Sequence, residues 1–167
     1  ETVSKLGSLR DELKKIKRVS TVLTILDVPL LRNPPVPIKE LIPNIKNLEH
    51  PDVDIHLART EIESSPIYQE LLVSADMKMT ALMVHFTEDA EYERVVSRRG
   101  DLRQKLSVNT ITPAERTELA QLKSAYRECK IRMDKERHSD IAAVRTIMDG
   151  YRQDAELFLG GISMITD

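Results

Sequence analysis

The chain has 167 residues, of which 41% are apolar and 31% charged, and its 25 basic and 27 acidic side chains give a formal net charge of -2. This length suits one domain, or one domain that carries a large insertion, and the near balance of charge excludes a global attraction to nucleic acid or to an anionic membrane. The single cysteine, Cys129, excludes an internal disulfide and a metal cluster built on thiolates.

The N-terminal part predicts a helix followed by a strand. Apolar residues spaced three and four apart indicate a helix that buries one face within residues 1–18. These residues are Leu6, Leu9, Leu13 and Ile16. Residues 19–28 are dense in β-branched side chains and predict a first strand, which Pro29 and the breaker sequence RNPPVP terminate. Prolines then favour an irregular connection over residues 38–51.

A short helix and two strands come next. Asp52 is a suitable N-cap for a helix over residues 53–64, and residues 71–75 and 79–87 predict strands joined by a tight hairpin at DMK. Alternation divides the second strand into two faces. The face predicted to meet the core holds Thr80, Leu82, Val84 and Phe86. The opposite face, which is neither fully apolar nor typical of a solvated surface, holds Met79, Ala81, Met83 and His85.

Residues 88–140 predict an antiparallel helical hairpin. A helix over residues 88–106 is followed by TPAE, in which Thr112 is the N-cap, Pro113 the first helical residue and Glu115 the end of a capping box. The second helix has a heptad stripe, formed by Leu119, Leu122, Tyr126, Cys129 and Met133. Its predicted partners on the first helix are Tyr92, Val95, Val96, Leu102 and Leu106, and the tip is SVNTIT.

The order of these elements indicates the fold class. The second helix can run for about 40 residues, and a polar stretch, DKERHSD, divides it into a half that belongs to the hairpin and a half over residues 141–153 that packs elsewhere. Residues 156–161 predict a last strand. The order strand, helix, strand, strand, helix, strand predicts an α+β fold of the ferredoxin-like βαββαβ type with a long inserted helical hairpin. In this interpretation the ferredoxin-like part comprises residues 19–87 and 141–167.

Four blocks of the sequence together resemble a known family. They are LTILDVPLLRNPPVP, SPIYQELLVSADMKMTALMVHF, HSDIAAVRTIMDGYR and AELFLGGISMI. Their order and spacing are similar to the first periplasmic loop of resistance-nodulation-division exporters, in the hydrophobe-exporter branch related to the mycobacterial membrane protein large family. The resemblance extends from about residue 17 to residue 165.

The resemblance implies a porter domain of a proton-driven exporter in the bacterial inner membrane, with this domain on the periplasmic side. Residues 1–18 are then expected to lead from the first membrane span, and GGISMITD to re-enter the membrane. The implied partners are hydrophobic or amphiphilic small molecules such as lipids, the transporter's own membrane helices and second periplasmic loop, and further protomers of a homo-oligomer. The proton-coupling carboxylates would lie in the membrane helices.

Two groups of residues are the candidate functional sites. Met79, Met83 and His85 are candidates for a substrate path, because methionines on a sheet face either fill the core or give varied ligands a flexible apolar lining. The second group is the hairpin tip, where Val108, Asn109 and Ile111 are candidates for partner contact. The alternative function is therefore a periplasmic interaction module in which the hairpin docks a partner.

No catalytic, cofactor or metal site is predicted. His50 and His56 flank two aspartates, but Pro51 interrupts the run and the spacing does not suit zinc. Cys129 lies in the heptad stripe, where a small buried side chain is expected and a catalytic thiol is not. Phosphate-binding loops and nucleophile elbows are also missing from the sequence, so we expect no enzyme.

Overall fold

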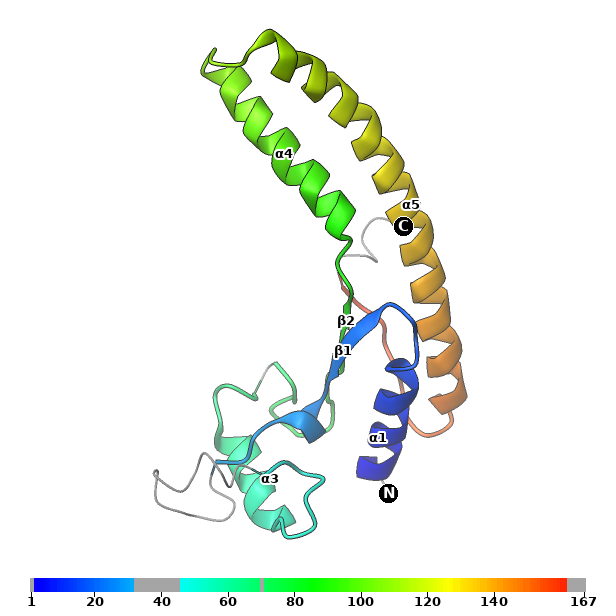
Figure 1. Cartoon of the computed structure of the whole chain (residues 1–167). Coiled ribbons are helices and arrows are strands. Elements are labelled where there is room, and N and C mark those ends of the chain that lie inside the picture. Colours follow the sequence, from blue (N-terminus) through cyan, green and yellow to red (C-terminus); the bar gives the residue numbers. More distant parts are fainter. Residues whose placement is uncertain (1, 32–45, 70, 162–167) are drawn as a thin grey trace. The chain divides into compact units, whose positions relative to one another are not determined.

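The computed structural model describes residues 2–31, 46–69 and 71–161. Two compact units make up the chain, residues 1–86 and residues 87–167 (Figure 1). The fold is mixed α+β, as predicted, with helices and a two-stranded antiparallel sheet in the described residues. Among the described helices, none combines the length and the apolar character that a membrane span requires. Most of the predicted irregular connection and the segment 162–167 lie outside the described residues.

Pairing between distant segments forms the sheet of the first unit. Strand β1 (Val19–Leu23) lies antiparallel to β2 (Met83–Phe86). Val22 pairs with Val84 and Leu23 with Met83, and the register shifts near Ser20, whose hydroxyl donates a hydrogen bond to the carbonyl of His85. The pairing therefore joins the first and third of the predicted strands.

The first predicted strand is shorter than expected because a capping box follows it. β1 ends at Leu23, and after the single residue Thr24 the 3₁₀ helix η1 (Ile25–Asp27) begins. The Thr24 hydroxyl accepts the amide of Leu26, while the Asp27 carboxylate accepts the amide of Thr24. These local bonds compete with the sheet for the same backbone, so the prediction of a strand to residue 28 was wrong.

Two of the four predicted strands are not formed. Residues 71–75 make isolated bridges in place of a strand, one parallel between Val73 and Gln69 and one antiparallel between Val73 and Thr80. Ser74 and Asp76 bond to each other and to the nearby backbone in a tight turn, which prevents a longer ladder. β2 accordingly begins at Met83 rather than at residue 79. Residues 156–160 have no backbone partner among the described residues, and the Phe158 side chain is 80% exposed. A strand requires an edge to pair with, and alternation alone does not supply one.

Helices α1 and α3 complete the described part of the first unit. Helix α1 (Thr2–Leu13) buries Leu9 and Leu13, as its spacing predicted, but it ends before Ile16, so the prediction that Ile16 belongs to the helix was wrong. Helix α3 (Ile55–Ser64) is capped by Asp54, which accepts the amides of His56 and Leu57, so the predicted cap at Asp52 was wrong. The core cluster of α3 and its neighbours consists of Leu30, Ala58, Ile62 and Val73, and Met77 packs against it.

The second unit is built on an antiparallel helical hairpin. Helix α4 (Ala90–Ser107) packs along the first part of α5 (Pro113–Tyr151), which continues unbroken through the polar stretch at residues 134–140 (Figure 1). The predicted capping box at Thr112 and Glu115 is confirmed. Leu102 and Cys129 are buried in the contact stripes, and the ring of Tyr92 stacks on that of Tyr126 with centroids 5.8 Å apart.

Leu102 is the test of hairpin packing, because its side chain is 0% exposed. Leu102→Ala removes buried methyl groups and leaves a cavity, so we expect the free energy of unfolding to fall by about 2–5 kcal/mol. Urea unfolding followed by far-ultraviolet circular dichroism measures the change. Leu106→Ala, at a position 43% exposed, is the control, and an equal loss in both variants would contradict the described packing.

Candidate functional site

One face of the β1–β2 pair is open to solvent. The predicted alternation is confirmed over residues 82–86, where Leu82, Val84 and Phe86 are half-buried and the two side chains between them are exposed. Thr80 departs from it and is exposed, with its hydroxyl bonded to the carbonyl of Leu72. The open face is therefore defined by β2 itself and not by the whole predicted strand.

The three substrate-path candidates all reach solvent. Met83 is 42% exposed and lies opposite Leu23, and His85 lies opposite Thr21. Met79 is 66% exposed and belongs to the turn before β2, where its amide and carbonyl both bond to Ser74. The structure thus brings Met83 and His85 onto one sheet face and leaves Met79 on the approach to it. Flexible thioethers in such a setting can adapt to apolar ligands of different shape.

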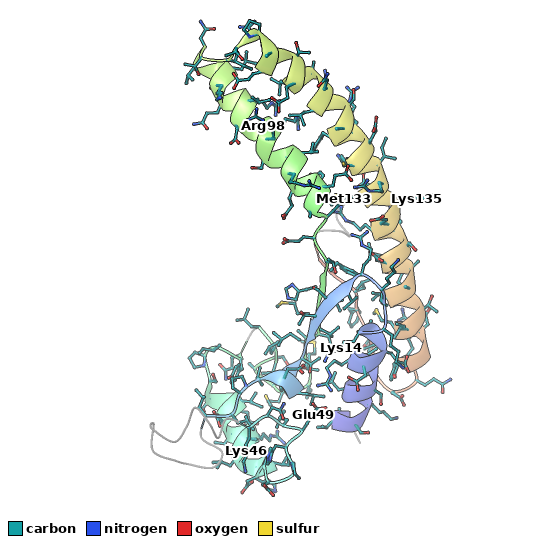
Figure 2. The ribbon with its side chains drawn as sticks, in the orientation of Figure 1. Lys14, Lys46, Glu49, Arg98, Met133 and Lys135 are labelled. Atoms are coloured by element: carbon teal, nitrogen blue, oxygen red, sulfur yellow. The ribbon has the colours of Figure 1, made fainter. Side chains whose placement is uncertain are left out.

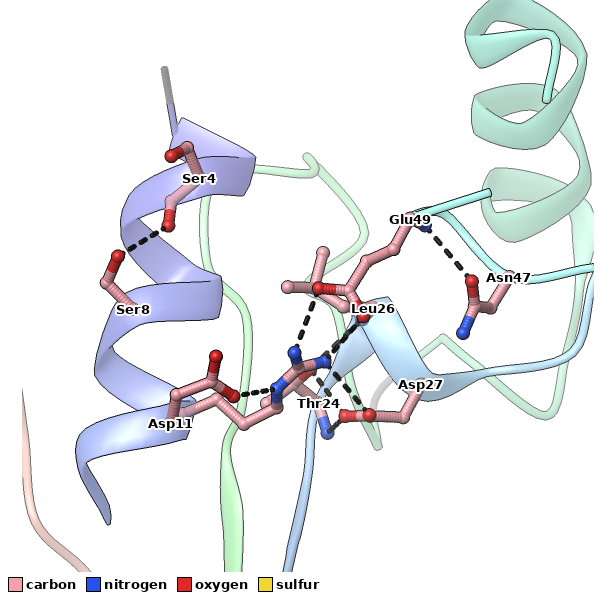
Figure 3. A network of polar contacts seen from close by, with 9 residues as sticks. Ser4, Ser8, Asp11, Thr24, Leu26, Asp27, Asn47 and Glu49 are labelled. Carbon is pink, nitrogen blue, oxygen red and sulfur yellow. Dashed lines mark hydrogen bonds and ion pairs between the residues drawn. The ribbon is translucent and has the colours of Figure 1, made fainter. Parts of the chain in front are cut away.

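A polar network that the sequence analysis missed positions this sheet (Figure 3). Arg10 on α1 is only 7% exposed, and its guanidinium binds both carboxylate oxygens of Glu49 at 2.9 Å. It also donates to Asp27 at 3.0 Å and to Asp11 at 3.1 Å. Asp27 completes the capping box with the N-cap Thr24, so one cation links α1, the end of β1 and the turn before α3.

The charge balance of this network favours the ionised arginine. The hydrogen bond to Glu49, followed by the bond to Asp11 and the nearby charge of Asp27, raises the pKa of Arg10 above its usual range despite partial burial. The only sequence signal is an arginine between Leu9 and Leu13 on the apolar side of the helix. Its partners outside α1, Asp27 and Glu49, are 17 and 39 residues away, which is why the pattern within α1 does not reveal them.

Arg10→Lys tests the network. An ammonium group cannot make the two parallel bonds to Glu49, so we expect the first unit to lose about 1–2 kcal/mol of unfolding free energy. Thermal unfolding of the full chain measures it. Arg59→Lys is the matched control, because Arg59 makes an exposed pair with Glu63 within one helix and should change stability by about 0.5 kcal/mol or less. If the network did not stabilise the fold, Arg10→Lys would change the free energy of unfolding as little as the control does.

The hairpin tip exposes the second group of candidates to different degrees. Val108 is 62% exposed, whereas Ile111 is half-buried. Asn109 adopts a left-handed backbone conformation with φ of 58°, which asparagine tolerates better than most residues. Its amide bonds to the carbonyl of Leu106, and the next amide bonds to that of Lys105, so the turn closes the end of α4. Val108 is thus the principal apolar contact that the tip offers.

Ion pairs hold the outer half of the hairpin together. Arg98 on α4 (Figure 2) binds both oxygens of Glu118 on α5 at 2.7 Å, and Lys105 binds Glu115. The Lys105 ammonium, helped by the amide of Thr112, lowers the pKa of Glu115 to about 2. The same carboxylate therefore closes the capping box and joins the two helices.

Acid should open this tip in a defined range. Because the pKa of Glu115 is lower in the folded chain, its contribution to stability is complete above the unfolded value of 4.5 and is lost as the pH falls toward about 2. We expect helical circular dichroism to fall over that interval. Glu115→Gln should have a smaller pH-dependent change there, and Glu128→Gln, at an exposed glutamate on the same helix, is the control. Identical acid transitions for all three proteins would contradict the assignment.

The remaining polar candidates do not gather into a reactive centre. His50 accepts the amide of Asp52 in a turn, His56 lies in the first turn of α3, and Cys129 is buried. Within the described residues, no group of three or more potential ligands could hold a metal ion.

Comparisons with known proteins give no match. Neither models of protein families, nor curated proteins, nor solved structures match this chain. The geometry described above, together with the resemblance in the sequence, is therefore the basis for a functional proposal.

Proposed function

We propose that the chain is the periplasmic porter domain of a proton-driven exporter of the resistance-nodulation-division superfamily. The observation that carries this proposal is the pairing of β1 with β2, which leaves one face bearing Met83 and His85 open. In this proposal the exporter lies in the bacterial inner membrane, and its cargo is hydrophobic or amphiphilic, such as lipids.

The proposed fold of the domain is ferredoxin-like. In that fold the first strand pairs with the third, and the second and fourth strands lie outside this central pair. The antiparallel β1–β2 ladder corresponds to the central pair, and the bridge from Val73 to Thr80 lies where the second strand would meet the third. Residues 156–161 would then add beside β1 as the fourth strand. This proposal goes beyond the two strands that are formed.

The alternative function is an interaction module in which the hairpin docks a periplasmic partner. The exposed side chains of Leu106 and Val108 at the tip favour it, because apolar groups presented at the end of a projection are typical of contact sites. The two functions place their critical residues in different units of the chain, so substitutions can separate them.

A lipophilic dye, N-phenylnaphthylamine, tests the substrate path directly. We expect its fluorescence to rise on binding the full chain, and we expect Met79→Ser with Met83→Ser to weaken that binding about fivefold, through loss of apolar contact area. The control replaces two exposed apolar residues elsewhere, Val3→Ser with Ile131→Ser, and should leave binding unchanged.

Two outcomes would count against the porter proposal. Equal weakening by the control would mean that the dye binds exposed apolar groups in general. Weakening by Val108→Ser alone would move the apolar site to the tip and support the interaction module. The parent gene gives an independent test, since an exporter of this class should encode about a dozen membrane spans, with one just before Glu1 and one just after Asp167.

A further inference from the structure

The two long edges of the hairpin differ in charge. In an antiparallel helix pair, each heptad places two residues in the contact stripe. The residue directly before the first of these two lies along one long edge of the pair, and the residue directly after the second lies along the other edge. On α4 the stripe runs through Tyr92, Val95, Arg99, Leu102 and Leu106, and on α5 it runs through Leu119, Leu122, Tyr126, Cys129 and Met133. These positions define a first and a second edge.

The first edge is filled with ion pairs between the helices. Arg98 precedes the stripe residue Arg99 and binds Glu118, which precedes Leu119. Two turns of α4 nearer the tip, Lys105 precedes Leu106 and binds Glu115. At the base of the hairpin, Arg132 binds both Glu91 and Asp89. The opposite charges on this edge are therefore paired from the base to the tip.

The second edge carries cations without acidic partners. On α5 the positions just after the stripe recur every seven residues as Arg116, Lys123 and Lys130, and Arg127 lies between the last two on the same flank. All four side chains are exposed, and none forms an ion pair with a residue in the described parts of the chain. At 1.5 Å per residue the row extends about 21 Å along α5.

The helix opposite adds a single acid to this edge within the described residues. On α4 the corresponding positions hold Glu93, Val96, Gly100 and Arg103, and Glu93 lies near the base of the hairpin and forms no ion pair with the four cations of α5. Val96 is 39% exposed, and a side chain at Gly100 would meet no atom within 4 Å. The second edge thus has an apolar contact point and a residue without a side chain on α4, beside a straight row of positive charge on α5. Within a chain of net charge -2, this excess of positive charge is local.

We infer that the second edge, formed by Val96, Gly100 and Arg103 of α4 and Arg116, Lys123, Arg127 and Lys130 of α5, docks an acidic helix of a partner protein. Cations seven residues apart suit carboxylates at the same helical spacing, and Gly100 lets the backbone of a third helix approach α4. Such a helix would supply the charges that the second edge lacks. The inference does not depend on the cargo of the proposed exporter.

Other anionic partners fit this edge less well. A bilayer surface would be bound by an amphipathic face with considerable apolar area, whereas Val96 is the one large apolar residue exposed on this edge within the described residues. Single-stranded nucleic acid is usually held by aromatic stacking, and aromatic residues are 4% of the chain, with Tyr92 and Tyr126 already stacked on each other.

A synthetic helix tests the proposal. The probe is a fluorescein-labelled peptide of about 21 residues with glutamates seven residues apart and alanine and leucine on the contacting face, and a scrambled peptide has the same composition. Fluorescence anisotropy with the full chain should give at least fivefold tighter binding for the patterned peptide. Raising NaCl from about 50 to 500 mM should weaken the binding, because exposed charges are screened.

Variants with equal net charge identify the binding surface. Arg116→Gln, Lys123→Gln, Arg127→Gln and Lys130→Gln together should weaken peptide binding on the order of tenfold, since exposed pairs contribute little individually but add up. The control removes four exposed lysines elsewhere, through Lys14→Gln, Lys15→Gln, Lys17→Gln and Lys135→Gln, and should stay within about twofold of the unchanged chain. Lys14 lies directly after α1, and Lys135 lies on α5 away from the second edge (Figure 2).

Gly100→Glu is a further check, because it adds a negative side chain in open space and should weaken binding without loss of helical circular dichroism. The proposal would be overturned by equal weakening in the edge and control variants, or by equal binding of the patterned and scrambled peptides. It would also be overturned if phosphatidylglycerol vesicles or duplex DNA bound the edge and the patterned peptide did not.

Discussion

The antiparallel pairing of β1 with β2 is the constraint on which the first unit depends. It joins residues about sixty positions apart, and its register decides which side chains face solvent. A slip of one residue would bury His85 and Met83 and expose Val84. The Arg10 network limits that freedom, because its guanidinium holds the Asp27 carboxylate just beyond the end of β1. The open face is thus maintained by a buried cation on the neighbouring helix.

The second unit separates packing from charge. Its stripes supply the contact between α4 and α5, while the ion pairs that join the two helices in the described residues lie along the first edge. Exposed pairs of this kind contribute modestly to stability, and their main effect is to fix register and orientation. The charges of the first edge are neutralised by pairing between the helices, so this edge attracts a charged partner weakly. The cations of the second edge remain available to a partner. The ion pairs that join α4 to α5 and the surface proposed to bind a partner therefore lie on different edges of the same two helices.

Most of the hairpin could be predicted because its signals are local, although Val96 is exposed and Arg99, which lies over the Tyr126 ring, takes the place in the stripe that was predicted for Val96. The heptad stripe and the capping box at Thr112 each lie within a few residues, so no distant contact had to be known. The ends of the strands could not be predicted in the same way. Side chains of Thr24 and Asp27, and of Ser74 and Asp76, bond to the local backbone and so compete with the pairing of strands. The role of Arg10 was not predicted for a different reason. Its guanidinium joins three segments that are separate in the sequence, and their proximity is visible only in the structure. The difference in charge between the two edges could not be predicted from the sequence, because it depends on how the two helices face each other. The observed pair of Arg98 with Glu118 shows which residues share an edge.

Continuity of α5 gives the second unit a mechanical property. The helix has 39 residues, or about 58 Å at 1.5 Å per residue, and its one proline is at the first position, while its one glycine is next to the last. Sharp kinks arise mainly at such residues, so the rod has no built-in joint between the tip and Tyr151. A load applied beside Arg116 would tilt the far end of the rod instead of being absorbed by a hinge. The hairpin can therefore transmit force along its length as well as bind. A partner bound along its second edge would move α5 as one rigid helix.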